Sequence, residues 1–513
     1  MKRNERWATL KEKVAARRAS VTVIGAGYVG LTTAVGAADA GFRVVCLEAD
    51  QERVRAINEG RSYVEGIKSA TLAALVSNGR LRATGKAEAL SRADVVLICV
   101  PTPLNASHEP DLSYVEQATQ AIAGHSAAGR LIILESTTYP GTTDEVVRPR
   151  LESSGLRAES DFWLAFSPER VDPGNKSFGL HNTPKIVGGV GPLSTRLAVG
   201  FFQAMVQKVV PVSSAAVAEM VKIYENVFRN VNIAFANEAA MLCDRIGIDV
   251  WEVIEAAATK PFGFVPFYPG PGMGGHCIPV DPHYLAWRAR QFDFHVKFIE
   301  LAASINADMP YYVCGKVTSA LNDQGKSVRG SSVLVLGAAY KRDIADVRES
   351  PALKVIPLLE RAGARVTYHD PYVPRLVVNG TKAMRSVPLT AKRLREVDCA
   401  LLLTDHSCLP YEILLEHAPL IVDTRNALRA RGLPVGMEPK VVTLYTPESN
   451  GKIGHGRIGL LIASKPPGSK AAAKKKNGRV NGGSLSNHRG RRIHRVAPGA
   501  SSRTPGRPRK NPG

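Results

Sequence analysis

The stretch GPGMGGHCIPVDP, residues 270–282, carries the side chain best suited to covalent chemistry. Cys277 lies between glycines, which let a backbone approach a ligand closely, and prolines, which stiffen it. Asp281, four residues further on, could take part in proton transfer. We therefore predict that Cys277 is a nucleophile, against the simpler alternative of a buried structural thiol.

Lys222 and Asn226 form a second candidate pair. They lie one helical turn apart in a mostly apolar segment that has no proline or glycine before Gly247. A cation and an amide on a buried helix are costly unless they have partners. The alternative is structural: the lysine extends its ammonium to solvent, and the asparagine amide is capped by a hydrogen-bond partner. Because the pair precedes the cysteine loop, we favour a functional role.

The N-terminal region predicts the elements that would bring a cofactor to this cysteine. A β-branched run at 21–24 is followed by GxGxxG and then by a helical segment, 31–40. A second strand, 43–47, ends at Glu48, 18 residues beyond the last glycine. Strand, glycine turn, helix and acid in this order predict a dinucleotide site rather than a glycine turn without a ligand.

Each glycine of that turn has a separate physical reason. Gly25 permits the tight turn, Gly27 lets a pyrophosphate approach the backbone, and Gly30 lets the helix pack closely on the strand. The phosphates would then lie at the positive N-terminus of the helix. Glu48 could accept hydrogen bonds from ribose hydroxyls and would repel a 2′-phosphate, which predicts NAD rather than NADP.

Further strands are predicted within ADVVLICVPTP, RLIILESTTYPGTT, DFWLAFSPER and TPKIVGG. They alternate with helical stretches, which predicts a doubly wound parallel sheet. Ligands of such sheets lie beyond the carboxyl ends of the strands. Thr102, Thr137 and Glu169 are therefore placed to face a cofactor or substrate, although each could be an ordinary turn or cap residue.

The rest of the chain predicts a helical middle domain and a second α/β domain. Helical segments continue to about residue 328, and residues 331–370 then repeat strand, glycine turn, helix and strand before an acid, Asp370. The glycine fingerprint is degraded to GAAYKRD, so we predict a Rossmann-like domain without its own dinucleotide site. Its turn offers Lys341 and Arg348, cations that suit phosphate.

Composition predicts a soluble cytoplasmic protein of several domains. The 513 residues, 44% of them apolar, include no run of ~18 apolar residues and no secretory signal. Seven scattered cysteines without a CxxC pair indicate neither disulfides nor a zinc site. Most of the net charge of +21 comes from residues 465–513, which hold 14 Lys or Arg and no acid. This composition is typical of a disordered tail, and its GRPRK weakly resembles the AT-hook, a short motif that binds the minor groove of DNA.

Several segments together resemble the UDP-glucose/GDP-mannose dehydrogenase family of nucleotide-sugar dehydrogenases, over residues 18–464. The motifs are GAGYVG, CVPTPL, ESTTYPGTT, FSPER, VKIYENVFRNVNIAFANE, GPGMGGHCIPVDP and AYKRDIADVRES. His276 and Val280 stand where UDP-glucose enzymes tend to have serine and lysine. The chain is therefore more similar to the branch that oxidises UDP-N-acetylglucosamine or its manno epimer.

The resemblance implies a three-part α/β chain, to which composition adds the tail. The parts are an NAD-binding Rossmann domain (1–212), a central helical dimerisation domain with the cysteine loop (213–328) and a Rossmann-like domain that binds the UDP-sugar (329–464), followed by the disordered basic tail (465–513). A homodimer or larger homo-oligomer through the middle helices is implied, with no metal.

The resemblance also implies the chemistry, a four-electron oxidation of the sugar C6 alcohol with two NAD⁺ for cell-surface polysaccharide precursors. Cys277 would add to the aldehyde to give a thiohemiacetal, whose oxidation yields a thioester that water cleaves. Lys222 and Asn226 would stabilise negative charge on the C6 oxygen. Asp281 and Glu169 would transfer protons.

The family's binding residues carry over onto matching positions. Those for the cofactor are Gly25, Gly27, Tyr28, Val29, Gly30, Glu48, Arg53, Thr102, Thr137 and Arg348. Those for the substrate are Glu169, Lys222, Asn226, Tyr268, Gly270, Gly274 and Lys341. Thr137 would also help to hold the hydrolytic water, and His276 could activate the thiol or only pack beside it.

Three alternatives stay open. A UDP-glucose 6-dehydrogenase would apply the same chemistry to another sugar. A 3-hydroxyacid-type dehydrogenase also joins a Rossmann domain to helices with a Lys-x-x-x-Asn pair, but it performs one oxidation and needs no thiol. The basic tail could instead belong to a protein that binds nucleic acid or a membrane surface on an enzyme scaffold.

Overall fold

The computed structural model describes residues 3–105, 107, 109–125, 128–171, 175, 177–275, 278–432 and 440–444. All of these belong to one compact unit, residues 1–450. The predicted basic tail lies outside the described residues. Within the described part, no helix combines the length and apolarity needed to cross a membrane.

An eight-stranded sheet forms the N-terminal domain, in the order β3-β2-β1-β4-β5-β6-β7-β8. The strands are β1 (Ser20–Ile24), β2 (Arg43–Leu47), β3 (Leu81–Thr84), β4 (Val95–Ile98), β5 (Leu131–Leu134), β6 (Trp163–Phe166), β7 (Lys185–Gly189) and β8 (Val209–Pro211). Strands β4, β5 and β6 are buried along their whole length. They are continuous apolar runs because helices cover both faces of such a sheet.

The predicted parallel sheet is wrong at one edge. Strand β7 pairs antiparallel with β6, and β8 is parallel to β7. A parallel pairing needs a long crossover, usually a helix. The described residues between Phe166 and Lys185 contain no helix, so the chain returns in the opposite direction.

Helices and short helical turns connect these strands. They are α1 (Arg3–Ala15), α2 (Tyr28–Asp39), α3 (Gln51–Asn58), α4 (Ser69–Ser77), η1 (Ala87–Arg92), α5 (Ser113–Gly124), η2 (Thr143–Val147), α6 (Arg148–Glu152) and α7 (Pro192–Phe202). The predicted helix after the glycine turn is confirmed, although it begins three residues earlier than predicted, directly after Gly27.

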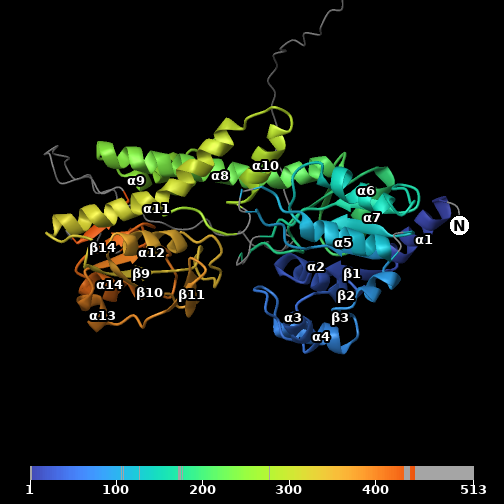
Figure 1. Ribbon diagram of the computed structural model, residues 1–513, viewed down its shortest axis with the longest axis horizontal. Helices are drawn as coiled ribbons and strands as arrows, with labels where there is room; N and C mark the ends of the chain where they lie inside the picture. Colours follow the sequence, from blue (N-terminus) through green and yellow to red (C-terminus); the bar gives the residue numbers. More distant parts are fainter. Residues whose placement is uncertain are drawn as a thin grey trace, which may run out of the picture. The chain divides into compact units, whose positions relative to one another are not determined.

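The predicted long helix of the middle domain is confirmed as α8 (Ala215–Ile246). The Ser214 side chain caps its start by accepting a hydrogen bond from the backbone N–H of Val217, and Gly247, with φ 74°, ends it. The other helices are α9 (Val250–Ala257), α10 (Asp281–Arg290) and α11 (Lys297–Asp323). Helix α11 lies alongside α8 (Figure 1).

The second α/β domain is a five-stranded parallel sheet in the order β10-β9-β13-β14-β15. Its strands are β9 (Ser332–Leu336), β10 (Arg365–His369), β13 (Cys399–Leu402), β14 (Ile421–Asp423) and β15 (Val441–Thr443), with a hairpin of β11 (Arg375–Val378) and β12 (Lys382–Arg385). Its helices are α12 (Ala352–Arg361), α13 (Ala391–Glu396), α14 (Tyr411–His417) and the short η3 (Arg429–Arg431). The predicted order of Rossmann, helical and Rossmann-like domains is confirmed.

Candidate active site

The glycine turn after β1 has the geometry that a dinucleotide needs. Gly25 has φ +85°, and a Cβ there would lie 2.6 Å from the carbonyl oxygen of Cys99. A Cβ at Gly30 would lie 1.9 Å from the carbonyl oxygen of Gly25, so only a glycine at position 30 lets the helix pack against the turn. A Cβ at Gly27 would meet nothing within 4 Å. The space beside Gly27 and the start of α2 therefore fit the pyrophosphate of NAD.

Glu48 lies at the end of β2, next to this turn, as predicted. It is buried, and its carboxylate accepts hydrogen bonds from the backbone N–H groups of Ala26 (2.7 Å) and Asp50 (3.0 Å). Arg53 from α3 lies 3.9 Å from the same carboxylate. Both residues are thus beside the nucleotide turn, where the ribose of NAD would lie.

A cavity of about 620 Å³ is lined by residues of all three domains. It brings together eleven of the predicted site residues: Tyr28, Val29, Thr137, Glu169, Lys222, Asn226, Tyr268, Gly270, Gly274, Lys341 and Arg348. The three glycines Gly25, Gly27 and Gly30 are not in its lining, nor are Glu48, Thr102 and Asp281. The cavity is therefore the substrate side of the predicted site, and it meets the nucleotide turn at Tyr28 and Val29.

Asp281, the first residue of α10, lies behind the cavity wall. It is 1% exposed, and its carboxylate accepts a hydrogen bond from the side-chain amide of Asn226. Burial raises the pKa of Asp281 to about 6, although Lys222 and the Asn226 amide oppose the rise. Asp281 can therefore gain or lose a proton close to neutral pH.

Glu169 is also buried but has the opposite electrostatic setting. Its carboxylate accepts hydrogen bonds from the backbone N–H groups of Arg170 (2.9 Å) and Val171 (2.7 Å) and from the Lys185 ammonium (3.2 Å). Burial alone would raise the pKa of Glu169, but Lys185, these hydrogen bonds and Lys222 lower it below its usual value. Two acids of one site thus differ in proton affinity, which commonly separates their roles.

Thr102 and Thr137 connect the nucleotide domain to α10. The Thr102 hydroxyl donates a hydrogen bond to the carbonyl oxygen of Thr137 (2.7 Å). The hydroxyl of Tyr284, a buried residue of α10, donates to the carbonyl oxygen of Thr102 (2.7 Å). Tyr284 is not among the predicted site residues, because its segment carries only a helical pattern. This contact fixes α10, which begins with Asp281, to two strand-end loops.

His276 and Cys277 lie outside the described residues, so the role of Cys277 stays a prediction. The described neighbours on either side, Gly275 and Ile278, both line the cavity. The backbone N–H of Gly275 donates to the carbonyl oxygen of Arg348 (2.8 Å). The carbonyl oxygen of Ile278 accepts from the side-chain amide of Asn230 on α8 (3.3 Å). Both neighbours are thus attached to other elements of the site.

The start of the cysteine loop is held by buried asparagines. The backbone N–H of Gly270 donates to the side-chain oxygen of Asn237 on α8 (3.0 Å), and the amide of Asn237 donates to Asn306 on α11 (2.9 Å). Tyr268, just before the loop, stacks on Trp251 with 5.2 Å between ring centroids. The central helices therefore fix the entry of the loop.

The second α/β domain supplies cations to the cavity. Lys341 and Arg348 line it as predicted, together with Arg425, which the sequence analysis missed. Burial lowers the pKa of Arg425 to about 10, so it stays cationic at neutral pH. Arg425 is the second residue after β14, and the rule that ligands lie beyond strand ends would have identified it. Arg229 on α8, also missed, adds a further cation.

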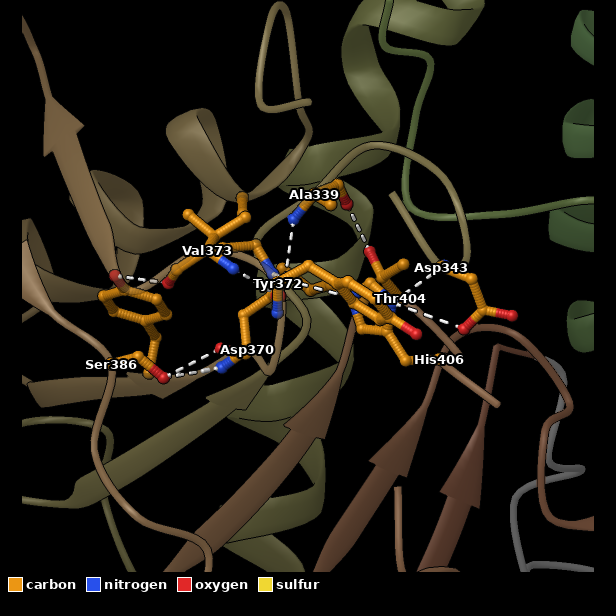
Figure 2. Close-up of polar contacts among 12 residues, drawn as sticks. Ala339, Asp343, Asp370, Tyr372, Val373, Ser386, Thr404 and His406 are labelled. Atoms are coloured by element: carbon orange, nitrogen blue, oxygen red, sulfur yellow. Dashed lines mark hydrogen bonds and ion pairs between the residues drawn. The ribbon is translucent and has the colours of Figure 1, made fainter. Parts of the chain in front are cut away.

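The turn after β9 differs from the first glycine turn. Asp370, at the end of β10, accepts hydrogen bonds from the backbone N–H groups of Ala338 (2.7 Å) and Ala339 (2.9 Å) (Figure 2). His406 accepts from the backbone N–H of Asp343 through Nδ1, so its Nε2–H donates to Asp370 (3.0 Å). Burial would raise the pKa of Asp370, but these hydrogen bonds lower it to about 2. No helix starts in residues 337–351, so this turn lacks the helix N-terminus that serves phosphates in the first domain.

Three family descriptions match consecutive parts of the chain. The NAD-binding domain of the UDP-glucose/GDP-mannose dehydrogenase family matches residues 19–206, its central domain residues 216–308, and its UDP-binding domain residues 334–430. These are the three folded parts described above.

Named relatives agree with this match. A UDP-N-acetyl-D-mannosamine dehydrogenase from Pyrococcus horikoshii is 39% identical over 354 residues, 69% of this chain and 84% of that protein. An NDP-N-acetyl-D-galactosaminuronic acid dehydrogenase from Ralstonia nicotianae is 36% identical over 75% of this chain and 90% of that protein. A solved structure of a UDP-D-ManNAc dehydrogenase from P. horikoshii superposes with a TM-score of 0.76 at 34% identity, covering 83% of this chain and 99% of that one. The chain therefore belongs to the UDP-glucose/GDP-mannose dehydrogenase family and is an NAD-dependent nucleotide-sugar dehydrogenase.

Proposed function

We propose that this enzyme oxidises the C6 alcohol of a UDP-2-acetamido sugar to the carboxylate, in two steps, for a cell-surface polysaccharide precursor. One observation carries the proposal: a single cavity holds a lysine–asparagine pair, a buried carboxylate and cations of the UDP-binding domain, and the neighbours of Cys277 line it. Such a cavity suits a sugar at one end and a diphosphate at the other.

The relatives described above favour a 2-acetamido sugar. They are named for N-acetylmannosamine and N-acetylgalactosaminuronic acid. We therefore rank UDP-N-acetylmannosamine ahead of UDP-N-acetylglucosamine, which the sequence motifs alone placed first.

Binding follows from the charges of the cavity wall. Lys341 and Arg425 would bind the diphosphate of the substrate, because each is a cation on the UDP-binding domain. Lys222 and Asn226 would bind the C6 oxygen and stabilise the negative charge that develops there. The glycine turn, Glu48 and the start of α2 would hold NAD⁺, which supplies the acceptor for the hydride of C6.

Proton transfer is assigned to Asp281. Burial raises the pKa of Asp281 to about 6, so it is ionised at neutral pH and would accept the proton of the alcohol through a water molecule, while Lys222 and Asn226 stabilise the charge left on the C6 oxygen. The Cys277 thiolate would then add to the aldehyde, and oxidation of this thiohemiacetal gives a thioester. Water held near Thr137 and Glu169 would cleave the thioester, releasing the carboxylate and the thiol.

NADH stoichiometry tests the proposal. We expect two NADH per substrate consumed in a panel of UDP-ManNAc, UDP-GlcNAc, UDP-GalNAc, UDP-glucose and GDP-mannose. Cys277→Ser should stop acid formation while NAD and nucleotide binding persist, and Cys408→Ser, an exposed thiol of the second α/β domain, is the matched control. One NADH per substrate would place the enzyme with single-step hydroxyacid dehydrogenases, and wild-type acid production by Cys277→Ser would exclude the thioester route.

We also propose that the enzyme is a homodimer in which α8 of each copy meets the other. One face of this 32-residue helix exposes apolar side chains along its whole length, with intervals of mainly four and seven residues. They are Val217, Met220, Tyr224, Phe228, Phe235, Leu242 and Ile246. An exposed apolar stripe of this kind marks an association surface, and α8 belongs to the helices that the family resemblance assigns to dimerisation.

A further inference from the structure

Lys185 is a buried ammonium group that lies behind the cavity rather than in its lining. It is the first residue of β7 and is 3% exposed. Its Nζ lies 2.7 Å from the Glu135 carboxylate and 3.2 Å from the Glu169 carboxylate. Of the three residues, Glu169 alone lines the cavity. Lys185 can therefore influence the cavity through Glu169 without meeting the substrate.

Stability alone is a weak reason for three buried charges. Removing charged groups from water is expensive, and well-packed apolar residues often stabilise a fold as well or better. The burial of Lys185 would lower its pKa, but Glu135 and Glu169 reverse this and raise the pKa above the usual value. The ammonium is therefore permanent, and the carboxylate at the cavity wall has a fixed cationic partner.

The charges around Glu169 come from several elements. Lys185 lies on β7, Glu135 directly after β5, and Lys222 on α8. The Arg170 guanidinium points instead to Glu225 on α8, 2.6 Å away. Behind Lys185, Glu135 accepts hydrogen bonds from the Thr33 hydroxyl (2.9 Å) and the Cys99 thiol (3.4 Å), and burial raises the pKa of this thiol, which stays neutral. Lys185 is thus the cation in hydrogen-bond contact with Glu169.

We propose that Lys185 is a positioning residue, whose ammonium keeps Glu169 a carboxylate at the cavity wall so that Asp281 is the acid that takes up protons. The inference rests on the proposed function. Burial is already the largest influence on Glu169 and would raise its pKa, and Lys185 is the strongest influence that opposes it; without the ammonium, the pKa of Glu169 would therefore rise. Protonated Glu169 would no longer present a negative charge to Lys222 and to the hydrolytic water.

The pH dependence of kcat/KM tests this role. In Lys185→Met, which removes the charge and keeps most of the length of the side chain, the acidic limb should move up by about one pH unit or more, with activity recovering at higher pH. Lys185→Arg keeps the charge and should retain the wild-type limb. In Glu135→Gln, Lys185 loses one of its two carboxylate partners and keeps Glu169, so the acidic limb of kcat/KM should not move up. An activity loss in Lys185→Met that is equal at all pH values would show a merely structural role and overturn the proposal.

A second measurement does not depend on turnover. Burial raises the pKa of Asp281 to about 6 and that of Glu219 to about 7, so in infrared difference spectra between pH 5 and pH 8 these two residues give carboxyl bands in every variant. Lys185→Met should show one further protonated carboxyl band, which disappears when Glu169→Gln is added. This Glu169 band should be absent from wild type and from Lys185→Arg. If the band appears as expected but no UDP-sugar is oxidised, the proposed function fails and the role of Lys185 stands. If Lys185→Met does not fold, two other results still overturn the inference. One is an upward shift of the acidic limb of kcat/KM in Glu135→Gln, and the other is a protonated Glu169 carboxyl band in wild type.

Discussion

Replacing Asp281 by asparagine should stabilise the fold at neutral pH while removing most activity. Asp281 is 1% exposed, and burial raises its pKa from 3.8 to about 6. Between these values the unfolded chain releases the proton more readily than the folded one, so stability falls as pH rises through this window. The gap corresponds to about 3 kcal/mol at pH 7, an upper limit for what Asp281→Asn can recover.

Unfolding midpoints at pH 4 and pH 7 measure this effect. We expect Asp281→Asn to unfold at a higher temperature than wild type at pH 7 and at nearly the same temperature at pH 4. Asp293→Asn, an exposed carboxylate just beyond the same helix, should change neither. Activity of Asp281→Asn should fall by about 10² or more if Asp281 is the general base. A variant less stable than wild type at pH 7 would refute the reasoning, because the hydrogen bond from Asn226 would then outweigh the burial of the charge.

Two further predictions concern the nucleotide turn and the exposed face of α8. Gly27→Ala should leave the thermal midpoint near wild type but weaken NAD binding about tenfold or more. Gly30→Ala should instead lower the midpoint, because its Cβ would overlap the carbonyl oxygen of Gly25. Wild-type NAD affinity in Gly27→Ala would contradict the assignment of Gly27 to the pyrophosphate site. Phe235→Glu should convert a dimer to monomers in sedimentation, while Phe178→Glu, at a similarly exposed residue of the N-terminal domain, should not. A wild-type monomer would exclude the α8 dimer.

The features that sequence could predict are those encoded locally. The turn around Gly27 depends on glycine geometry, and Glu48 follows from its place after a short β-branched strand. The length of α8 follows from a run without helix breakers that ends at Gly247. Lys222 and Asn226 share a face because of helical spacing alone.

The features that sequence missed depend on contacts between distant segments. Lys185 reads as the first residue of an ordinary strand, and only the reversed direction of β7 places it between two strand-end acids. Tyr284 reads as a core aromatic until its hydroxyl is seen on the carbonyl oxygen of Thr102, 182 residues away. Arg425 lies in the last third of the chain and reaches a loop of the middle domain: a Cβ at Gly270 would lie 2.7 Å from its guanidinium. No local pattern encodes such distances.

Helix α8 shows how one element organises the site. Five polar residues repeat at intervals of three, four and seven, which puts them on one face: Glu219, Lys222, Asn226, Asn230 and Asn237. Glu219 accepts hydrogen bonds from the backbone of Gly141 (2.6 Å) and Thr143 (2.9 Å), which ties the helix to the nucleotide domain. The next two residues serve the cavity, and the last two hold the two ends of the cysteine loop.

The apolar stripe of α8 occupies the opposite face, because its members fall about half a turn away from the polar set at 3.6 residues per turn. In the proposed dimer, a single long helix would therefore carry the catalytic residues on one face and the association surface on the other. The polar contacts are all made within one chain, so a monomer keeps the lysine–asparagine pair and the loop anchors. What a monomer loses is the cover over seven exposed apolar side chains of the helix that carries the site. Dimerisation would then act on this enzyme through the stability of α8, and not by completing its catalytic groups.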